Sequence, residues 1–144
     1  MDSAQGGVTK ALCCLNARAI DFARLGQLML DGGQRDGRQI IPAAWIADSL
    51  AVREHPGGDA DTRANLQRPG ARHGAFYTWQ WRRMATPAPT ETGWRPTADF
   101  YAQGHHGQYI YVAPAQQMVI VRFGREHGSD WWWPGLMGRI AAMN

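Results

Sequence analysis

The sequence of 144 residues predicts an α+β fold in which an antiparallel sheet is flanked by helices. Three observations support this. Helical periodicity dominates residues 1–53, strand-like segments occupy 75–124, and a closing helix is expected at 129–143. Helices followed by antiparallel strands are the order typical of α+β proteins. Between the helical segment and the strands, residues 54–74 are rich in Gly, Asp, Arg and Pro without apolar periodicity, so we expect a loop there.

Two helices are expected in the first segment. Apolar residues recur at helical spacing from Ala19 to Leu30, with Asn16 as the expected N-cap and Gly32-Gly33 as the stop, which predicts a helix over about 17–31. Asp36-Gly37 is a turn signal. Pro42 suits the first position of a second, short helix that runs to Leu50.

From Ala75 the pattern becomes strand-like. Residues 76–81 are dense in aromatic and β-favouring side chains and predict a strand, whereas 84–97, with three prolines, is expected to be a long connection. Further strands are expected at about 98–103, 108–113 and 118–123, the last two paired as an antiparallel hairpin. Ser129 or Asp130 is expected to cap the closing helix.

Composition argues against several classes of protein. The 15 basic and 12 acidic residues give a net charge of +3 without a basic stripe, so a nucleic-acid surface is not expected. No apolar run reaches the roughly 18 residues of a membrane span, and Met1-Asp2-Ser3 does not resemble a secretion signal. Cys13 and Cys14 are adjacent, which suits neither a disulfide between them nor a metal quartet, so we expect two buried thiols.

Aromatic and histidine clusters allow more than one interpretation. Trp131-Trp132-Trp133 could stack on sugars, but three consecutive residues cannot share one helix face, so at least one is expected to pack onto the sheet. His105-His106, with His127, could suggest a metal site. Metal ligands on a strand must face the same way, and adjacent residues on an extended segment point to opposite faces, so we expect no metal. We expect the two histidines to lie on the turn at the mouth of the cleft, one solvated and one packed. A histidine acting as general base would need a nearby nucleophile, and none is apparent.

Several segments together resemble one family. Residues 16–26 resemble the helix motif ArDfArfG, 36–42 with Trp45 are similar to dGkqIlP..W, and 76–81 resemble the strand yGYqWW. Residues 104–112 are similar to the hairpin GyGGQyifV, with 119–121 as its return strand. These motifs are those of the β-lactamase-related serine hydrolases, which include class C β-lactamases, penicillin-binding esterases and 6-aminohexanoate-dimer hydrolases.

The resemblance implies that residues 1–144 form a single partial domain, the C-terminal part of a β-lactamase/transpeptidase-like fold. It also implies a parent reaction in which an ester or amide is hydrolysed through an acyl-enzyme, without a cofactor, on a small-molecule substrate. The compartment is left open, because the family includes periplasmic and cytoplasmic members.

The family's nucleophile is missing from this sequence. Catalysis there requires a serine that a lysine three residues later activates. The chain has the serines Ser3, Ser49 and Ser129 and the single lysine Lys10, which glycine rather than serine precedes at that spacing. The family's Tyr-x-Asn or Ser-x-Asn element is absent as well. No catalytic side chain is therefore expected, and the chain alone is predicted to be catalytically incomplete.

A third family element is matched by Ala102-Gln103-Gly104, where lactamases carry Lys-Thr-Gly. The resemblance implies that these three residues line the substrate, that the backbone N–H of His105 is an oxyanion donor, and that Gly107 and Gln108 form the turn. Glycine at 104 would permit close approach of the substrate. Ala102 departs from the lysine or histidine of the lactamases, which favours an esterase- or amidase-like parent.

A non-enzymatic interpretation remains open. The chain could be a binding or interaction module, or a half that complements an N-terminal half on another chain, since an uncovered sheet edge attracts further strands and favours self-association. A truncated gene product is the simplest form of this hypothesis.

Overall fold

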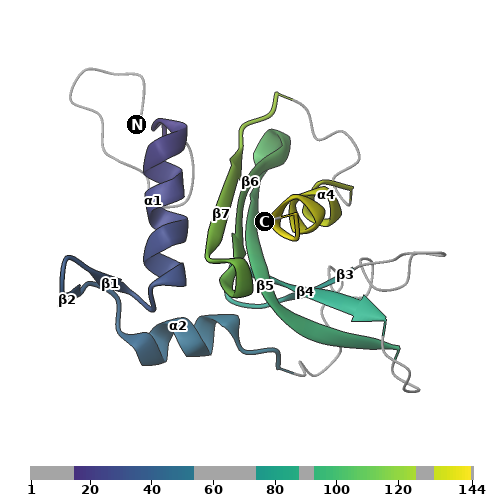
Figure 1. Ribbon diagram of the computed structural model, residues 1–144, viewed down its shortest axis with the longest axis horizontal. Coiled ribbons are helices and arrows are strands. Elements are labelled where there is room, and N and C mark those ends of the chain that lie inside the picture. The colour runs from purple at the N-terminus through teal and green to yellow at the C-terminus, as the bar shows by residue number, and fades with distance from the viewer. Residues whose placement is uncertain (1–14, 54–73, 88–92, 126–131, 144) are drawn as a thin grey trace.

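The computed structural model describes residues 15–53, 74–87, 93–125 and 132–143. Its centre is a five-stranded antiparallel sheet in the order β3-β4-β5-β6-β7, so strands adjacent in sequence are adjacent in space. Helices α1 (Ala19–Leu30) and α2 (Ala43–Leu50) lie on one side of this sheet and α4 (Trp132–Ala141) on the other (Figure 1). The predicted α+β class is confirmed. None of the described helices is long and apolar enough to span a membrane.

Helix α1 agrees with the predicted helix except at its start. Its N-cap is Arg18 rather than Asn16, because the backbone N–H of Arg18 donates to the Asp21 carboxylate at 3.2 Å. This contact replaces the side-chain cap expected from Asn16. At the other end, the N–H of Gly33 donates to the carbonyl of Leu28 at 2.8 Å, and positive φ angles at Gly32 and Gly33 end the helix as expected.

The predicted turn at Asp36-Gly37 is confirmed. It joins the two short strands β1 (Gln34–Arg35) and β2 (Arg38–Gln39), with positive φ at both turn residues. Pro42 is the N-cap of α2, one position earlier than predicted.

The first strands of the sheet differ from the prediction. The prediction of a single strand over 76–81 is wrong. Strand β3 (Gly74–Tyr77) ends at Tyr77, and a tight turn over 78–81 leads into β4 (Arg82–Pro87). Gln80 adopts φ 64° in this turn, which lacks the Gly or Asn that usually marks such geometry. Gly74, expected in the loop, belongs to β3, and the remainder of that predicted loop lies outside the described residues.

The long connection expected at 84–97 is also wrong where the structure describes it. These residues extend β4 and open β5 (Trp94–Gly104). Pro96 is accommodated opposite Ala85, next to a register shift between Arg83 and Ala85, and proline is tolerated in sheets at such irregularities.

The last elements follow the prediction closely. Strand β6 (Gln108–Ala113) pairs with β7 (Met118–Arg122) through the short 3₁₀ link at Pro114–Gln116. Helix α4 is described from Trp132, so Ser129 and Asp130, like Cys13 and Cys14, lie outside the described residues.

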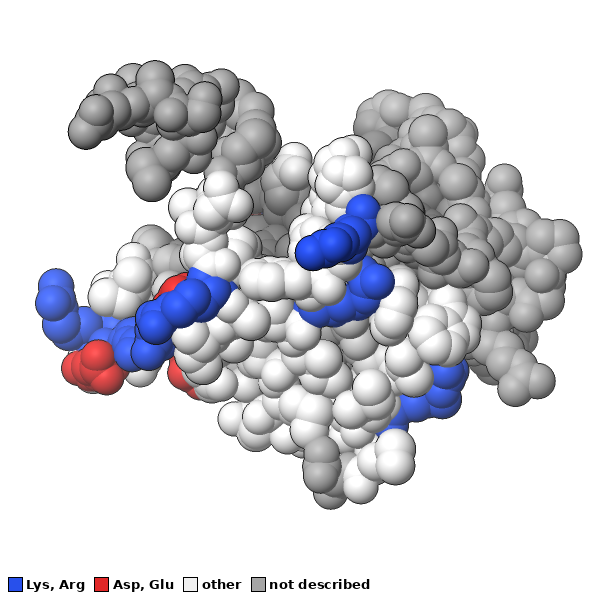
Figure 2. Space-filling view, turned by 90° about the horizontal axis from the view of Figure 1, so that it is seen from above, with Lys and Arg blue, Asp and Glu red and all other residues white. Residues whose placement is uncertain are grey.

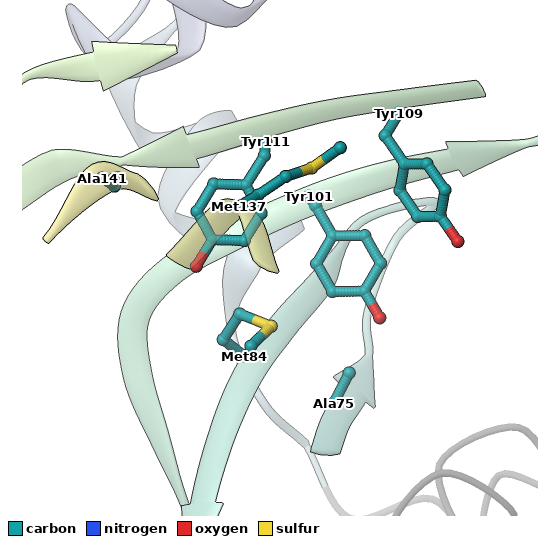
Figure 3. Close-up of a cluster of buried hydrophobic side chains, with 8 residues drawn as sticks. Ala75, Met84, Tyr101, Tyr109, Tyr111, Met137 and Ala141 are labelled. Carbon is teal, nitrogen blue, oxygen red and sulfur yellow. The ribbon is translucent and has the colours of Figure 1, made fainter. Parts of the chain in front are cut away.

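Buried side chains form a cluster on each face of the sheet, because neighbouring residues of a strand point to opposite faces. In β6, Tyr109 and Tyr111 face α4, while Ile110 and Val112 face α1 and α2. Figure 3 shows the cluster on the α4 face. Its members are Ala75, Met84, Tyr101, Tyr109, Tyr111, Ala113, Met137 and Ala141. Trp133 packs against this cluster whereas Trp132 is 43% exposed, which confirms that part of the tryptophan run packs onto the sheet.

Candidate functional site

The candidate site residues predicted from the sequence lie at the end of the hairpin that β5 and β6 form. Strand β5 ends at Gly104, a 3₁₀ turn covers His105–Gly107, and β6 begins at Gln108, which pairs with Gly104 across the hairpin. Gly104, His105 and His106 are exposed. The turn therefore presents its backbone at the rim of the sheet.

The three residues expected to line the substrate do not point the same way. Ala102 packs, partly buried, against the cluster beneath α1 and α2. Gln103 pairs in register with Tyr109, whose side chain belongs to the opposite face. By the alternation of the strand only Ala102 and Gly104 share a face. A ligand on the α1 side would thus meet the Gly104 backbone, and the Gln103 side chain would lie on the other side of the sheet.

Glycine is not required at 104 by the backbone, since its φ of −111° is open to any residue. A Cβ at this position would lie 3.3 Å from Cβ of Gln108, which is a tight contact. The role of Gly104 in substrate approach stays a prediction, as does the role of the His105 N–H.

His106 occupies a conformation that favours glycine. Its φ of 59° is followed by φ 74° at Gly107, and the family motif has glycine at both positions. The rings of His105 and His106 lie 3.8 Å apart, and both residues are exposed. The two histidines lie on a turn, as expected, but the expectation that one of them is packed is wrong, because the turn places both residues at the exposed rim of the sheet. Across the described part of the chain, no group of three or more His, Cys, Asp or Glu side chains could hold a metal ion, and His127 lies outside that part.

Two side chains hold the turn in place. The amide of Gln108 donates to the Gly124 carbonyl at 2.6 Å and accepts from the Gly124 N–H at 3.2 Å. The guanidinium of Arg122 donates to the Gly107 carbonyl and lies 3.9 Å over the ring of Trp133. Gln108, expected to form the turn, is the first residue of β6 and holds the turn through its side chain, whereas no role was predicted for Arg122 from the sequence. Its signal in the sequence is a single charge that ends the apolar segment 118–121.

The described residues offer no activated nucleophile. Ser49 is completely buried, and its hydroxyl donates to the Ile46 carbonyl at 2.9 Å. The hydroxyl of Tyr111 donates to the Asp99 carboxylate at 2.6 Å, and burial raises the pKa of this phenol far above its ordinary value of 10.0. Tyr111 therefore stays protonated and cannot serve as a general base near neutral pH. Ser3, Ser129 and Lys10 lie outside the described residues.

A polar groove of about 590 Å³ lies elsewhere, between the C-terminal half of α1 and the β1–β2 hairpin. Figure 2 shows Arg and Asp side chains gathered on this side of the molecule. The lining residues are Arg24, Gln27, Leu28, Asp31, Gln34, Arg35, Asp36 and Gly37. The 105–107 turn does not contact this groove but lies against Gly124. The neighbouring Phe123 packs its ring on Phe22, which is in the first turn of α1, away from the C-terminal half that lines the groove. The groove and the turn are therefore separate features.

No family model matches the sequence. The chain is 28% identical over 138 residues to the 6-aminohexanoate-dimer hydrolase of Paenarthrobacter ureafaciens, covering 95% of this chain and 30% of that protein. A solved structure from Bacillus anthracis, assigned by name to the 6-aminohexanoate-dimer hydrolases, superposes with a TM-score of 0.52 at 27% identity, over 85% of this chain and 28% of that one.

These similarities agree with the motifs and the fold. The chain has the fold of part of a β-lactamase-related serine hydrolase. More particularly, it is a partial homologue of the 6-aminohexanoate-dimer hydrolases and spans less than a third of the length of the relatives it matches.

Proposed function

We propose that this chain contributes the substrate-facing strand β5 and one oxyanion donor, the backbone N–H of His105, to a hydrolase that cleaves an ester or amide through an acyl-enzyme. The observation that carries the proposal is the match of nearly the whole chain to a 6-aminohexanoate-dimer hydrolase. An ester or amide substrate is proposed for two reasons: the name of this relative, and Ala102, which stands where lactamases carry lysine or histidine.

The local structure supports a role in holding a carbonyl oxygen. An oxyanion donor must be oriented before the reaction, because it stabilises the developing charge most when the protein does not have to reorganise around it. The clamp between Gln108 and Gly124 and the bond from Arg122 to Gly107 restrain the turn that follows Gly104. Removing one such donor from a complete site lowers kcat by about 10²–10³.

The nucleophile has to come from another segment, because no Ser-x-x-Lys occurs in these 144 residues. The test is reconstitution. The purified chain is mixed with a polypeptide that comprises the part of the Paenarthrobacter ureafaciens relative without a counterpart here, and hydrolysis of a chromogenic ester is followed. We expect no saturable hydrolysis by either polypeptide alone and hydrolysis by the mixture.

A matched pair of variants addresses the strand. Gly104→Val should abolish hydrolysis by the mixture, whereas Arg38→Val, at an exposed position of the distant strand β2, should leave it unchanged. Saturable hydrolysis by the chain alone would refute its catalytic incompleteness. A folded mixture that binds but does not hydrolyse would refute the contribution to catalysis. It would favour the second candidate, a non-catalytic interaction module, which is supported by the edge strand β7, with which only β6 pairs among the described residues.

A further inference from the structure

His106 keeps a backbone conformation that costs free energy. Its φ of 59° lies in the left-handed region, and φ 74° at Gly107 makes the two residues a left-handed pair. Residues other than glycine disfavour this region, so the glycine that the family motif has at position 106 would be the more stable residue there. A side chain that is kept at such a cost points to a functional role.

The turn is held too closely to relax this conformation. Gly124 lies directly against it, because a Cβ built at Gly124 would be 2.7 Å from the carbonyl oxygen of His106. The guanidinium of Arg122 holds the next carbonyl, that of Gly107, and the amide of Gln108 makes two hydrogen bonds with the Gly124 backbone. The backbone of His106 therefore lies between restrained neighbours, which fixes the point from which its side chain extends.

The imidazole ring of His106 lies beside that of His105. The two ring centroids are 3.8 Å apart, the ring planes are inclined by 52°, and both residues are exposed. The family motif GyGGQyifV has tyrosine at position 105 and glycine at position 106, whereas this chain has histidine at both. One ring at this rim is therefore shared with the motif, and the ring of His106 is the one that this chain adds.

The two rings border any carbonyl group that the proposed oxyanion donor holds. That donor is the backbone N–H of His105, whose nitrogen is bonded to the Cα that carries the His105 side chain. A carbonyl oxygen about 3 Å from this nitrogen lies only a few bond lengths from the first ring. The ring of His106 lies against the first. The groups attached next to the carbonyl carbon are therefore the part of a substrate that meets the two rings.

We propose that the ring of His106 narrows the site next to the scissile carbonyl and selects substrates that are unbranched there. This role rests on the proposed function, because it concerns a substrate held by the His105 N–H. An unbranched acyl chain can pass the two rings, whereas a methyl branch on the carbon next to the carbonyl would contact them. Discrimination by a single such group is typically about 10–200-fold in kcat/KM.

The test uses the mixture of this chain with the polypeptide from the relative and two substrates, para-nitrophenyl butanoate and para-nitrophenyl isobutanoate. These esters have the same leaving group and the same number of carbon atoms, and the measured quantity is the ratio of their kcat/KM values. His106→Asn removes the ring and tolerates a positive φ, so the preference for butanoate should fall at least about tenfold. His106→Phe keeps a ring of similar width, and the preference should stay within about threefold of the wild-type value.

Circular dichroism establishes that both variants are folded. An unchanged preference in His106→Asn would overturn the role of the ring and leave the proposed function intact. An equal loss of preference in the two variants would also overturn it, because bulk would then not be the property that selects the substrate. Hydrolysis of neither ester by the wild-type mixture would overturn the proposed function and the role of His106 together.

Discussion

Gly26 provides a sharp test of how α1 is packed on the sheet. The glycine lies where the helix crosses β6 and β7, and a Cβ built there would be 2.5 Å from Cγ1 of Val119 and 2.9 Å from Cγ2 of Ile110. Contacts between carbon atoms are ordinarily about 3.5–4.0 Å. Both neighbours are β-branched and have little rotamer freedom. Gly26→Ala should therefore push the helix away from the sheet.

The size of the effect follows from two opposing contributions. Overpacking a core by one methyl group costs about 1–3 kcal/mol, and two contacts short by about 1 Å favour the upper part of that range. Alanine in place of a helical glycine returns about 1 kcal/mol of helix propensity. The net loss in the free energy of unfolding should be about 1–2 kcal/mol. For a chain of this size that lowers Tm by about 2–8 °C.

Chemical and thermal unfolding followed by far-ultraviolet circular dichroism measure this loss. The matched control is the double variant Gly26→Ala with Val119→Ala, which removes the closest methyl group. Its two changes should couple favourably by at least about 1 kcal/mol relative to the sum of the single variants. If Gly26→Ala instead stabilised the chain by about 1 kcal/mol, helix propensity alone would govern this position and the packing argument would be refuted.

Three further predictions concern the turn and the core. His106→Gly should raise the free energy of unfolding by about 0.5–1 kcal/mol in urea titrations, because φ at this position is 59°; a loss of stability would contradict this. Tyr111→Phe should lower it by about 1.5–3 kcal/mol by removing the bond to Asp99. Because the folded state raises the pKa of Tyr111 above 10.0, the wild-type chain should lose stability as pH rises above 10, and the variant should lose less. Arg122→Met should speed amide hydrogen exchange around Gly107, and unchanged exchange would show that the side chain does not hold the turn.

Elements specified by local patterns were predictable from the sequence. Helix α1 and the β6–β7 hairpin each combine a regular apolar period with Gly or Pro at their ends, and the β1–β2 turn is marked by the dipeptide Asp36-Gly37 alone. The β3–β4 hairpin was missed because its turn at 78–81 carries bulky aromatic residues and no glycine, so that strand propensity continues unbroken through the turn. The strand predicted at 98–103 is part of β5, but its first residues, 94–97, were assigned to the connection because Pro96 is normally read as a strand breaker.

The candidate site also has some features that local sequence predicts and others that it does not. The motif at 102–108 and the lack of Ser-x-x-Lys follow from the order of residues alone, because both depend on spacings of a few positions. Only the tertiary structure decided which layer Ala102 packs against and what restrains the turn. The bonds from Arg122 to Gly107 and from Gln108 to Gly124 join residues 15 and 16 positions apart, and the pairing of β6 with β7 is what brings them together. Contacts of this kind depend on how strands align in the folded sheet, which no local period in the chain specifies.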